Sequence, residues 1–382
     1  MHFVMKLSKL CNLRCSYCYE YDELGDRGRM PLDRLDWFFA SLAEHYVAAG
    51  WRFKLSFVFH GGEPLLLPER YLRALVGVMH HRLGAANVPF SMSMQTNLTR
   101  LTDRTIDLLD ELRIALGVSI DVYGGQRLTI SGEDAQDRAL DNLQRLFDRD
   151  AVRRLGVGGI SVLHGRNVDR AVDTFEFYRG LGLDYRVLPV FSITDPPPRM
   201  HGLTLTADRV VAAMQQVALA QLRARPSIRV FPLDNYFESA VRHLAGAACP
   251  RYDPRAVEWA LIVDTDGDAY NHAEAYLPEG RMGNIFRDRF ADILASPGRA
   301  ATLALRTARA ATCDACPYHD ACSGIPVIEA LPSERSYSLA GHLECTVARP
   351  MIAFMTELLR ADKVAAGRIA EFVAERGVER VA

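Results

Sequence analysis

The sequence predicts an α/β fold built from parallel strands, because short apolar runs alternate with longer stretches whose apolar residues recur at helical spacing. Counting the first run, the pattern gives six strand–helix units. Folds of this kind place their chemistry at the carboxyl ends of the strands. The periodicity is compatible with a partial barrel and also with a doubly wound open sheet. The expected strands are 3–7, 53–59, 90–95, 114–120, 157–163 and 185–190, and the expected helices are 32–49, 69–83, 102–112, 134–147 and 168–181.

The composition is typical of a globular enzyme of the cytoplasm. A chain of 382 residues with 49% hydrophobic content can fill one large core and a smaller one. A net charge of −2 and a pI near 6.6 argue against nucleic acid as the partner. We find no signal peptide and no apolar run long enough to cross a membrane. The eight cysteines are therefore expected to bind metal rather than to form disulfides.

Three cysteines follow the first expected strand within eight residues. Cys11, Cys15 and Cys18 lie in the loop that leaves the carboxyl end of the run 3–7. Three thiolates can hold three irons of a 4Fe-4S cube and leave the fourth iron open, whereas a closed cluster or a structural zinc site needs four ligands. The alternatives are a zinc loop with a distant fourth ligand and a set of buried structural thiols.

The spacing C-x3-C-x2-C, with Tyr17 just before the last cysteine, resembles the signature of the radical S-adenosylmethionine (SAM) superfamily. The resemblance implies that the open iron chelates the amino and carboxylate groups of SAM, with Tyr17 among the SAM contacts. An electron from an external flavodoxin- or ferredoxin-type donor then produces a 5'-deoxyadenosyl radical. It also implies a partial (β/α)6 TIM-like barrel, which agrees with the six units.

A second motif, His60-Gly61-Gly62-Glu63-Pro64, follows the second expected strand. Glycines let the backbone approach a ligand closely, and a carboxylate beside them can accept hydrogen bonds from an ammonium group. The family resemblance implies that Gly61, Gly62 and Glu63 hold the amino group of SAM. The alternative is an ordinary strand-to-helix turn in which Pro64 starts the helix.

Two further strand ends carry candidate SAM-binding residues. Asn97 ends the third strand and resembles a family element whose amide contacts SAM or substrate, although an Asx turn explains it nearly as well. Ser119 ends the fourth strand, and the resemblance makes Ser119 and Arg127 candidates for the SAM carboxylate or ribose. Asp121 is expected as a helix cap or a wall of the pocket. Val122 stands where the family usually has glycine.

A second cysteine set lies near the C-terminus. Cys313, Cys316, Cys322 and Cys345 give C-x2-C-x5-C and a distant fourth thiol. This resembles the end of the SPASM module, an extension that carries auxiliary 4Fe-4S clusters, and implies one fully ligated auxiliary cluster. Together with the SAM-binding cluster this predicts two 4Fe-4S clusters. A four-cysteine zinc knuckle has the same spacing and is the alternative.

The first auxiliary site of the SPASM pattern is expected to be lost. Where the family has cysteines, this chain has His272 and Pro326, and proline cannot ligate iron. Cys249 remains as a buried leftover or an occasional ligand. The segment 259–271 is expected to form a hairpin with a tight Asp-Gly turn rather than a calcium loop. The expected domains are a barrel at 1–225, a SPASM-like domain at 226–350 and a C-terminal helix at 351–382.

The resemblance implies peptide modification, because radical SAM enzymes with this kind of extension mostly modify peptides or proteins. We expect a maturase that crosslinks a ribosomally made precursor peptide, with a carbon–carbon bond of the cyclophane type favoured. A separate leader-peptide-binding protein is a further expected partner. The alternatives are thioether formation, epimerisation, sulfatase-maturase-like oxidation, a small-molecule radical SAM oxidoreductase and a non-catalytic zinc protein.

Sulfatase-maturing enzymes share the Cys-x-Tyr-Cys-Tyr stretch found here at 15–19. They use an aspartate directly after a hairpin cysteine as a base, and this chain has His272 and Ala273 at those two positions, so that activity is not expected. No general base can be assigned from the sequence. The acidic or imidazole side chains expected near the cavity are Asp266, Asp268, His272 and Glu274.

Overall fold

The computed structural model shows two compact units, which are described separately. Unit 1 consists of Met1–Ile120, Gly125–Gly158 and Glu258–Ala304, and unit 2 of Asp121–Gly124, Gly159–Val257 and Leu305–Ala382. The structure describes residues 1–191, 195–246, 260–271, 276, 278–310, 313, 315–319, 321–322, 345–361 and 367.

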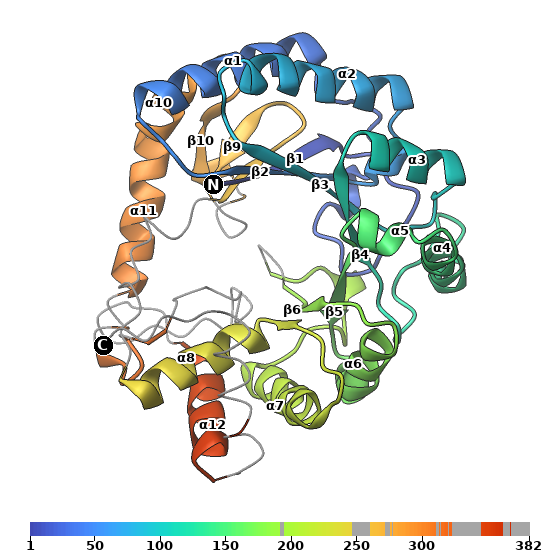
Figure 1. The fold of residues 1–382 in the computed structure, drawn as a ribbon, viewed down its shortest axis with the longest axis vertical. Helices are drawn as coiled ribbons and strands as arrows, with labels where there is room; N and C mark the ends of the chain where they lie inside the picture. Colours follow the sequence, from blue (N-terminus) through green and yellow to red (C-terminus); the bar gives the residue numbers. More distant parts are fainter. Residues whose placement is uncertain are drawn as a thin grey trace. The chain divides into compact units, whose positions relative to one another are not determined.

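Unit 1 is built on a mostly parallel sheet with the strand order β10-β9-β8-β1-β2-β3-β4 (Figure 1). The strands β8, β1, β2, β3 and β4 run parallel, whereas β9 and β10 are antiparallel additions at one edge. The strands are β1 (His2–Ser8), β2 (Leu55–Gly61), β3 (Phe90–Thr96), β4 (Ile114–Ser119), β8 (Ala260–Val263), β9 (Asp268–Tyr270) and β10 (Arg281–Asn284).

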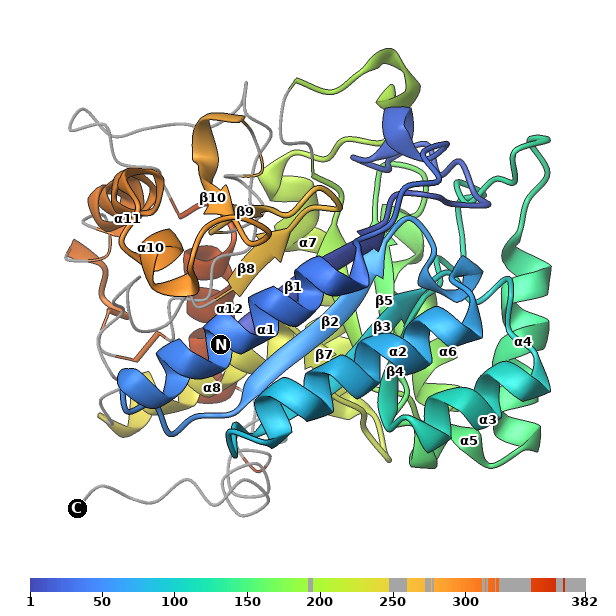
Figure 2. The same ribbon diagram turned by 90° about the horizontal axis from the view of Figure 1, so that it is seen from above.

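The two faces of this sheet differ in polarity. Buried apolar residues alternate with half-buried ones along β2, β3 and β4, as the period of a strand requires. Figure 2 shows α1 and α2 lying along one face, where Phe3 stacks on Phe57 at 4.8 Å and meets Phe38 of α1 at 5.9 Å. The half-buried positions of the other face carry mainly small or polar residues, such as His60, Gln95 and Ser119. The helices of unit 1 are α1 (Leu32–Ala48), α2 (Glu69–Met79), α3 (Asp103–Glu111), α4 (Gln136–Asp148), α5 (Ala151–Arg154) and α10 (Phe290–Leu294).

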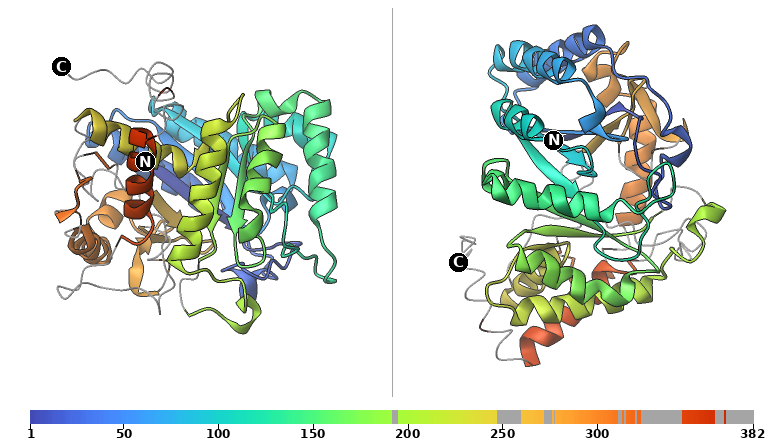
Figure 3. Two further views of the ribbon diagram at one scale, coloured as in Figure 1. Left: turned by 90° about the horizontal axis from the view of Figure 1, so that it is seen from below. Right: turned by 90° about the vertical axis from the view of Figure 1, so that its right-hand side faces the viewer.

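Unit 2 combines three parallel strands with helices that pack on one another. Its strands are ordered β5-β6-β7. Tyr178 of α6 stacks on Tyr185 of β6 at 4.3 Å, and both side chains are buried. The helix α12, drawn in red in Figure 3, packs on α8 and α7. The elements are β5 (Gly158–Leu163), β6 (Tyr185–Pro189), β7 (Val230–Phe231), α6 (Ala171–Gly180), α7 (Ala207–Arg223), α8 (Leu233–Ala245) and α12 (Ala348–Ala361), while α11 (Pro297–Ala310) begins in the last segment of unit 1.

The expected α/β fold and its strands are confirmed. Each expected strand and helix is present within about three residues, except that the end of the helix 69–83 becomes a π-helical turn at His80–Gly84. The hairpin at 259–271 is formed by β8 and β9, and Gly267 takes a positive φ of 92° in its turn. The helices α7 and α8 were not predicted. In the part of the chain that the structure describes, no helix has the length and apolar character to span a bilayer.

Candidate active site

The loop that carries the first three cysteines, residues 11–18, is held by backbone hydrogen bonds. Arg14 N–H donates to the Leu128 carbonyl at 2.6 Å, and Ser16 N–H donates to the Gln126 carbonyl at 3.2 Å. A further β-bridge joins Leu13 to Thr129. The segment 126–129, which lies far away in the sequence, therefore helps to fix the path of this cysteine loop.

The cysteine loop brings its three thiols together. Cys11, Leu13 and Leu24 form a small buried apolar cluster, and the half-buried Cys15 and Cys18 pack against it. Burial raises the pKa of Cys11 to about 11, with Glu63 and Cys18 adding to the shift. Cys11 is therefore a protonated thiol at neutral pH, and a metal must displace its proton on binding.

The glycines of the second motif are explained by contact with the strand end that leads into the cysteine loop. A Cβ on Gly61 would lie 2.0 Å from the Ser8 carbonyl oxygen, and one on Gly62 would lie 2.2 Å from that of Lys9. Gly61 also has a φ of +127°, which side chains rarely allow. Pro64 opens a 3-10 turn, which is the alternative that the sequence offered for this motif. The two glycines therefore allow the backbone at the end of β2 to contact the backbone that follows β1.

Glu63 joins β2 to the end of β3. It is 2% exposed, and its carboxylate accepts hydrogen bonds from Leu65 N at 2.9 Å, Thr96 Oγ1 at 2.8 Å and Asn97 N at 2.7 Å. Burial raises the pKa of Glu63, while these hydrogen bonds and Arg127 oppose the shift. Its carboxylate therefore has a structural task, and a direct contact with the SAM amino group stays a prediction.

Asn97 links the end of β3 to the cysteine loop. Its Oδ1 accepts a hydrogen bond from Thr99 N at 3.0 Å, which is the Asx turn that was the alternative role for Asn97. Its Nδ2 donates to Asn12 Oδ1 at 3.1 Å and lies 3.8 Å from Cys11 Sγ. Arg127, buried to 7% exposure, donates to the Tyr17 hydroxyl at 3.1 Å.

Two residues singled out from the sequence, Ser119 and Asp121, have hydrogen bonds at other places in the structure. Ser119 accepts a hydrogen bond from Gln95 Nε2 at 2.6 Å, which makes a separate pair on the polar face of the sheet. Asp121 belongs to unit 2, where its carboxylate accepts a hydrogen bond from Val162 N at 2.7 Å. That bond holds the start of a loop against β5, so it is not a helix cap, and a place for Asp121 in the wall of the pocket stays a prediction.

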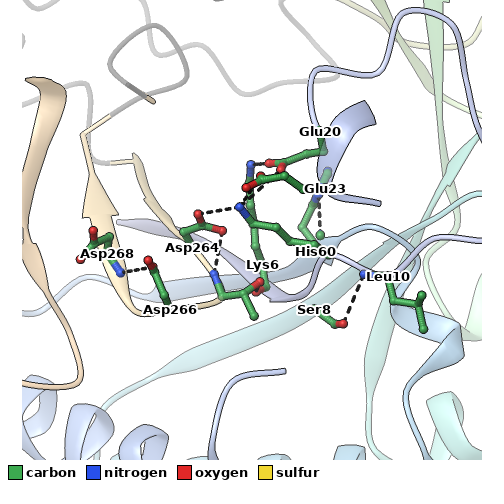
Figure 4. Close-up of polar contacts among 12 residues, drawn as sticks. Lys6, Ser8, Leu10, Glu20, Glu23, His60, Asp264, Asp266 and Asp268 are labelled. Atoms are coloured by element: carbon green, nitrogen blue, oxygen red, sulfur yellow. Dashed lines mark hydrogen bonds and ion pairs between the residues drawn. The ribbon is translucent and has the colours of Figure 1, made fainter. Parts of the chain in front are cut away.

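Sequence reasoning missed a charged cluster beside the cysteine loop, formed by Lys6, Lys9, Glu20, Glu23 and Asp264. Figure 4 labels each of these residues except Lys9. Lys6 is fully buried and forms an ion pair with Glu20. Lys9 pairs with Glu23 and lies 2.9 Å from Asp264. A usable signal was present, because only four of the 45 basic residues are lysines and two of these four are Lys6 and Lys9.

Two tyrosines cover this charged cluster. The Lys6 ammonium lies 3.6 Å from the ring centre of Tyr276 and 4.5 Å from that of Tyr19. Tyr276 also hydrogen-bonds to Asp264, and burial together with this carboxylate raises the pKa of Tyr276. The Tyr276 hydroxyl is therefore protonated and donates to Asp264.

The expected proton acceptors of the hairpin have other partners. Asp266 accepts from Asp268 N at 3.0 Å within the turn, and Asp268 pairs with Arg281 at 2.7 Å. Asp268 also accepts from Asn284 Nδ2 at 2.7 Å. His272 and Glu274, together with Ala273, lie outside the described residues.

The C-terminal cysteines lie in unit 2 on tight turns. Cys316 N–H donates to the Cys313 carbonyl at 2.9 Å, and Cys322 N–H donates to the Tyr318 carbonyl at 2.8 Å. Cys345 precedes α12, and its Sγ accepts from Arg349 N at 3.2 Å. All four are half-buried and none forms a disulfide. Cys249 and Pro326 lie outside the described residues, so the expected loss of the first auxiliary site stays a prediction.

The donor set of the cysteine loop fits an iron–sulfur cluster. A zinc ion draws its ligands to about 2.3 Å from one point, whereas each thiolate of a four-iron cube binds a different iron. Within the described residues no three His, Cys, Asp or Glu side chains converge on a point that could hold one metal ion. The three thiols of this short loop contact one apolar cluster, and a four-iron cube that keeps one iron open is held by three thiolates.

Comparisons with known proteins agree with this geometry. Residues 5–178 match the family model of the radical SAM superfamily. The chain is 22% identical over 305 residues to a cysteine-type anaerobic sulfatase-maturating enzyme of Clostridium novyi (strain NT), covering 76% of this chain and 77% of that enzyme. It is 27% identical over 242 residues to an uncharacterized protein of Methanothermobacter thermautotrophicus, covering 63% of this chain and 86% of that protein.

Solved structures share the fold. The structure of anSMEcpe with bound AdoMet and the Cp18Cys peptide has a TM-score of 0.75 at 16% identity and covers 98% of both chains. Streptococcus suis SuiB bound to its precursor peptide SuiA has a TM-score of 0.57 at 15% identity, covering 85% of this chain and 71% of SuiB.

Proposed function

We propose that this enzyme, whose residues 5–178 match the family model of the radical SAM superfamily, abstracts a hydrogen atom from a ribosomally made peptide and crosslinks that peptide. The observation that carries the proposal is the gathering of Cys11, Cys15 and Cys18 around one apolar cluster at the end of β1. Peptides are bound in the structures of two proteins with this fold, anSMEcpe and SuiB. A carbon–carbon bond of the cyclophane type is the favoured product.

Cys11, Cys15 and Cys18 would hold the SAM-binding 4Fe-4S cluster, which supplies the electron that generates a 5'-deoxyadenosyl radical from SAM. The residues around it have separate tasks. Asn97 donates a hydrogen bond toward Cys11 Sγ, and Arg127 places positive charge near both Cys11 and Glu63. Arg127 also fixes the Tyr17 hydroxyl.

SAM itself is proposed to bind at the carboxyl ends of β1 to β4. Backbone groups of Gly61 and Gly62 would meet its amino group, and Ser119 and Arg127 its carboxylate or ribose. The polar face of the sheet, with His60 and Gln95 half-buried, would then receive the peptide. The opposite face is packed with phenylalanines and excludes water from the core.

The four C-terminal cysteines are proposed to bind one auxiliary 4Fe-4S cluster. Cys313, Cys316 and Cys322 lie on consecutive tight turns, and Cys345 lies just before α12. An external flavodoxin- or ferredoxin-type protein would supply electrons, and a separate leader-peptide-binding protein would present the substrate. Clusters of this kind need a reducing compartment, so we place the enzyme in the cytoplasm.

The test is co-expression with the precursor peptide encoded beside the gene, under conditions that load iron. A crosslinked peptide lacks two hydrogens, and tandem mass spectrometry locates the bridge between the modified residues. The control is the Cys11/Cys15/Cys18→Ala variant, which leaves the peptide unmodified. Conversion of a sulfatase peptide instead would favour the maturase-like alternative, and SAM cleavage with no peptide product would favour a small-molecule substrate.

A further inference from the structure

One arginine of unit 2 carries a charge that no carboxylate of the described chain pairs with. Arg186, the second residue of β6, is exposed and makes neither a hydrogen bond nor an ion pair within the described residues. Two other arginines of the same unit have partners, since Arg179 of α6 pairs with Glu176 and Arg229 pairs with Asp184 at 2.9 Å. Arg186 lacks the countercharge that these two arginines have.

Arg186 projects from the face of β6 that is opposite to α6. Tyr185 is buried where it stacks on Tyr178 of α6, and successive residues of a strand point to opposite faces. The strand register places Ile160 of β5 on one side of Arg186 and Phe231 of β7 on the other, all three on the same face. Both neighbours are half-buried and apolar.

The surroundings of the Arg186 guanidinium are apolar. Val162 of β5 and Leu188 of β6 continue the same face toward the carboxyl ends of the strands, and both are half-buried. Burial lowers the pKa of Arg186, so protein atoms surround much of the guanidinium although part of it stays exposed. Arginine nevertheless keeps its charge in proteins. A charge that is partly withdrawn from water without a partner destabilises the fold, which indicates that an anionic ligand supplies the partner.

We propose that Arg186 binds the carboxylate of an acidic side chain of the precursor peptide, an inference that deepens the proposed function and rests on it. A guanidinium donates two parallel hydrogen bonds to a carboxylate, so one arginine suffices to anchor one acidic residue. Ile160 and Phe231 then contact apolar atoms beside that carboxylate and keep water away, which strengthens the charge pair. The substrate is thereby defined as a peptide with an acidic residue next to an apolar one.

SAM also carries a carboxylate, but its expected contacts Ser119 and Arg127 belong to unit 1. Arg186 belongs to unit 2 and lies three residues before Pro189, the carboxyl end of its strand. Parallel α/β folds bind their cofactors at the carboxyl ends of the strands. The peptide is therefore the source of the carboxylate that Arg186 is placed to bind.

The experiment measures peptide binding and needs no turnover. The probe is the precursor peptide encoded beside the gene, labelled with a fluorophore and titrated with iron-loaded enzyme, and fluorescence anisotropy gives its Kd. Arg186→Gln should weaken binding about 10- to 100-fold, whereas Arg186→Lys should keep part of the affinity. The matched control is Arg223→Gln, which removes an exposed arginine of α7 that likewise has no ion pair within the described part of the chain. This control should bind the peptide as wild type does.

The peptide supplies a complementary set of variants. Its acidic residues are replaced one at a time by the corresponding amide. One position should weaken binding to wild type about as much as Arg186→Gln does, and the same change should have no further effect on that variant. A peptide with lysine at this position should bind Arg186→Glu at least about tenfold more tightly than the natural peptide does.

Urea unfolding distinguishes ligand binding from a structural role. Removal of a charge that has no partner leaves no other group unpaired. Arg186→Gln should therefore unfold at the same urea concentration as wild type or at a higher one. Formation of 5'-deoxyadenosine from SAM without peptide should match that of wild type.

Each outcome is decisive. Equal peptide affinity of wild type and Arg186→Gln, or the absence of any acidic position that matches it, would overturn the inference and leave the proposed function standing. A lower unfolding midpoint would assign Arg186 a structural role, and loss of SAM cleavage at full iron content would assign it to SAM; both would also overturn the inference. If wild-type enzyme binds no peptide, the proposed function fails and the inference fails with it.

Discussion

Replacement of Gly62 by alanine tests the contact between the glycine motif and the strand end that leads into the cysteine loop. The new Cβ would lie 2.2 Å from the Lys9 carbonyl oxygen and 2.3 Å from that of Leu10. Both are backbone atoms, so the segment must move. Movement weakens two backbone hydrogen bonds of 2.8 Å, from Gly62 N to Ser8 and from Glu63 N to Leu10. Overpacking costs about 1–3 kcal/mol and each bond about 1 kcal/mol, which gives roughly 3–5 kcal/mol.

Urea unfolding of the metal-free protein measures this loss, and iron content after anaerobic reconstitution reports its effect on the cysteine loop. The matched control is Gly77→Ala. Gly77 is exposed in α2, and a Cβ there meets nothing within 4 Å, so alanine should stabilise the helix by up to about 1 kcal/mol. Equal unfolding free energies for the two variants, with equal iron content, would refute the reasoning.

Three further predictions concern single side chains. Asn97→Ala removes the Asx turn and the contact with Cys11, so urea unfolding of the metal-free protein should show a loss of about 1–2 kcal/mol. An unchanged free energy of unfolding would contradict this. Burial raises the pKa of Cys11 to about 11, so little of this thiol is ionised at pH 8. Iodoacetamide should therefore alkylate Cys11 on the order of 100-fold more slowly than a free thiol, as measured by mass spectrometry. Alkylation at the rate of a free thiol would show that Cys11 is accessible. Burial lowers the pKa of His60 from 6.5 to about 4. Between these two pH values the unfolded chain binds a proton at His60 that the folded chain does not bind. The free energy of unfolding therefore falls as the pH drops from 6.5 to 4, by up to about 3 kcal/mol. His60→Gln should show a shallower fall in urea unfolding between pH 7 and pH 4, and an unchanged slope would exclude His60 as the cause.

Local sequence patterns predict the strands and the first cysteine site because both depend on neighbours in the chain. The apolar alternation of β2, β3 and β4 follows from one face packing on helices, and the structure confirms it. The grouping of Cys11, Cys15 and Cys18 likewise follows from a short loop after β1. The Asx turn at Asn97 involves only residues two positions apart.

The charged cluster could not be predicted in the same way, because its members are far apart in the sequence. Asp264 reaches Lys9 only because β8 adds to the sheet beside β1, and nothing local to either residue indicates that pairing. Asp266 and Asp268 looked like better acid–base candidates from the Asp-rich hairpin. The register of β8 beside β1 brings Asp264 to Lys9 instead, while Asp266 and Asp268 stay in the hairpin turn.

Gly61, Gly62 and the cysteine loop form one structural feature, although the sequence shows them as two separate motifs. Gly61 and Gly62 are required because their backbone contacts Ser8 and Lys9, which lead directly to Cys11. A chain that loses the cysteine loop would no longer need these glycines, and a chain that keeps it could hardly replace them. Their joint occurrence therefore supports one site geometry. It is not two independent indications that SAM binds there, which is why SAM binding needs its own measurement on a Gly62 variant that still holds iron.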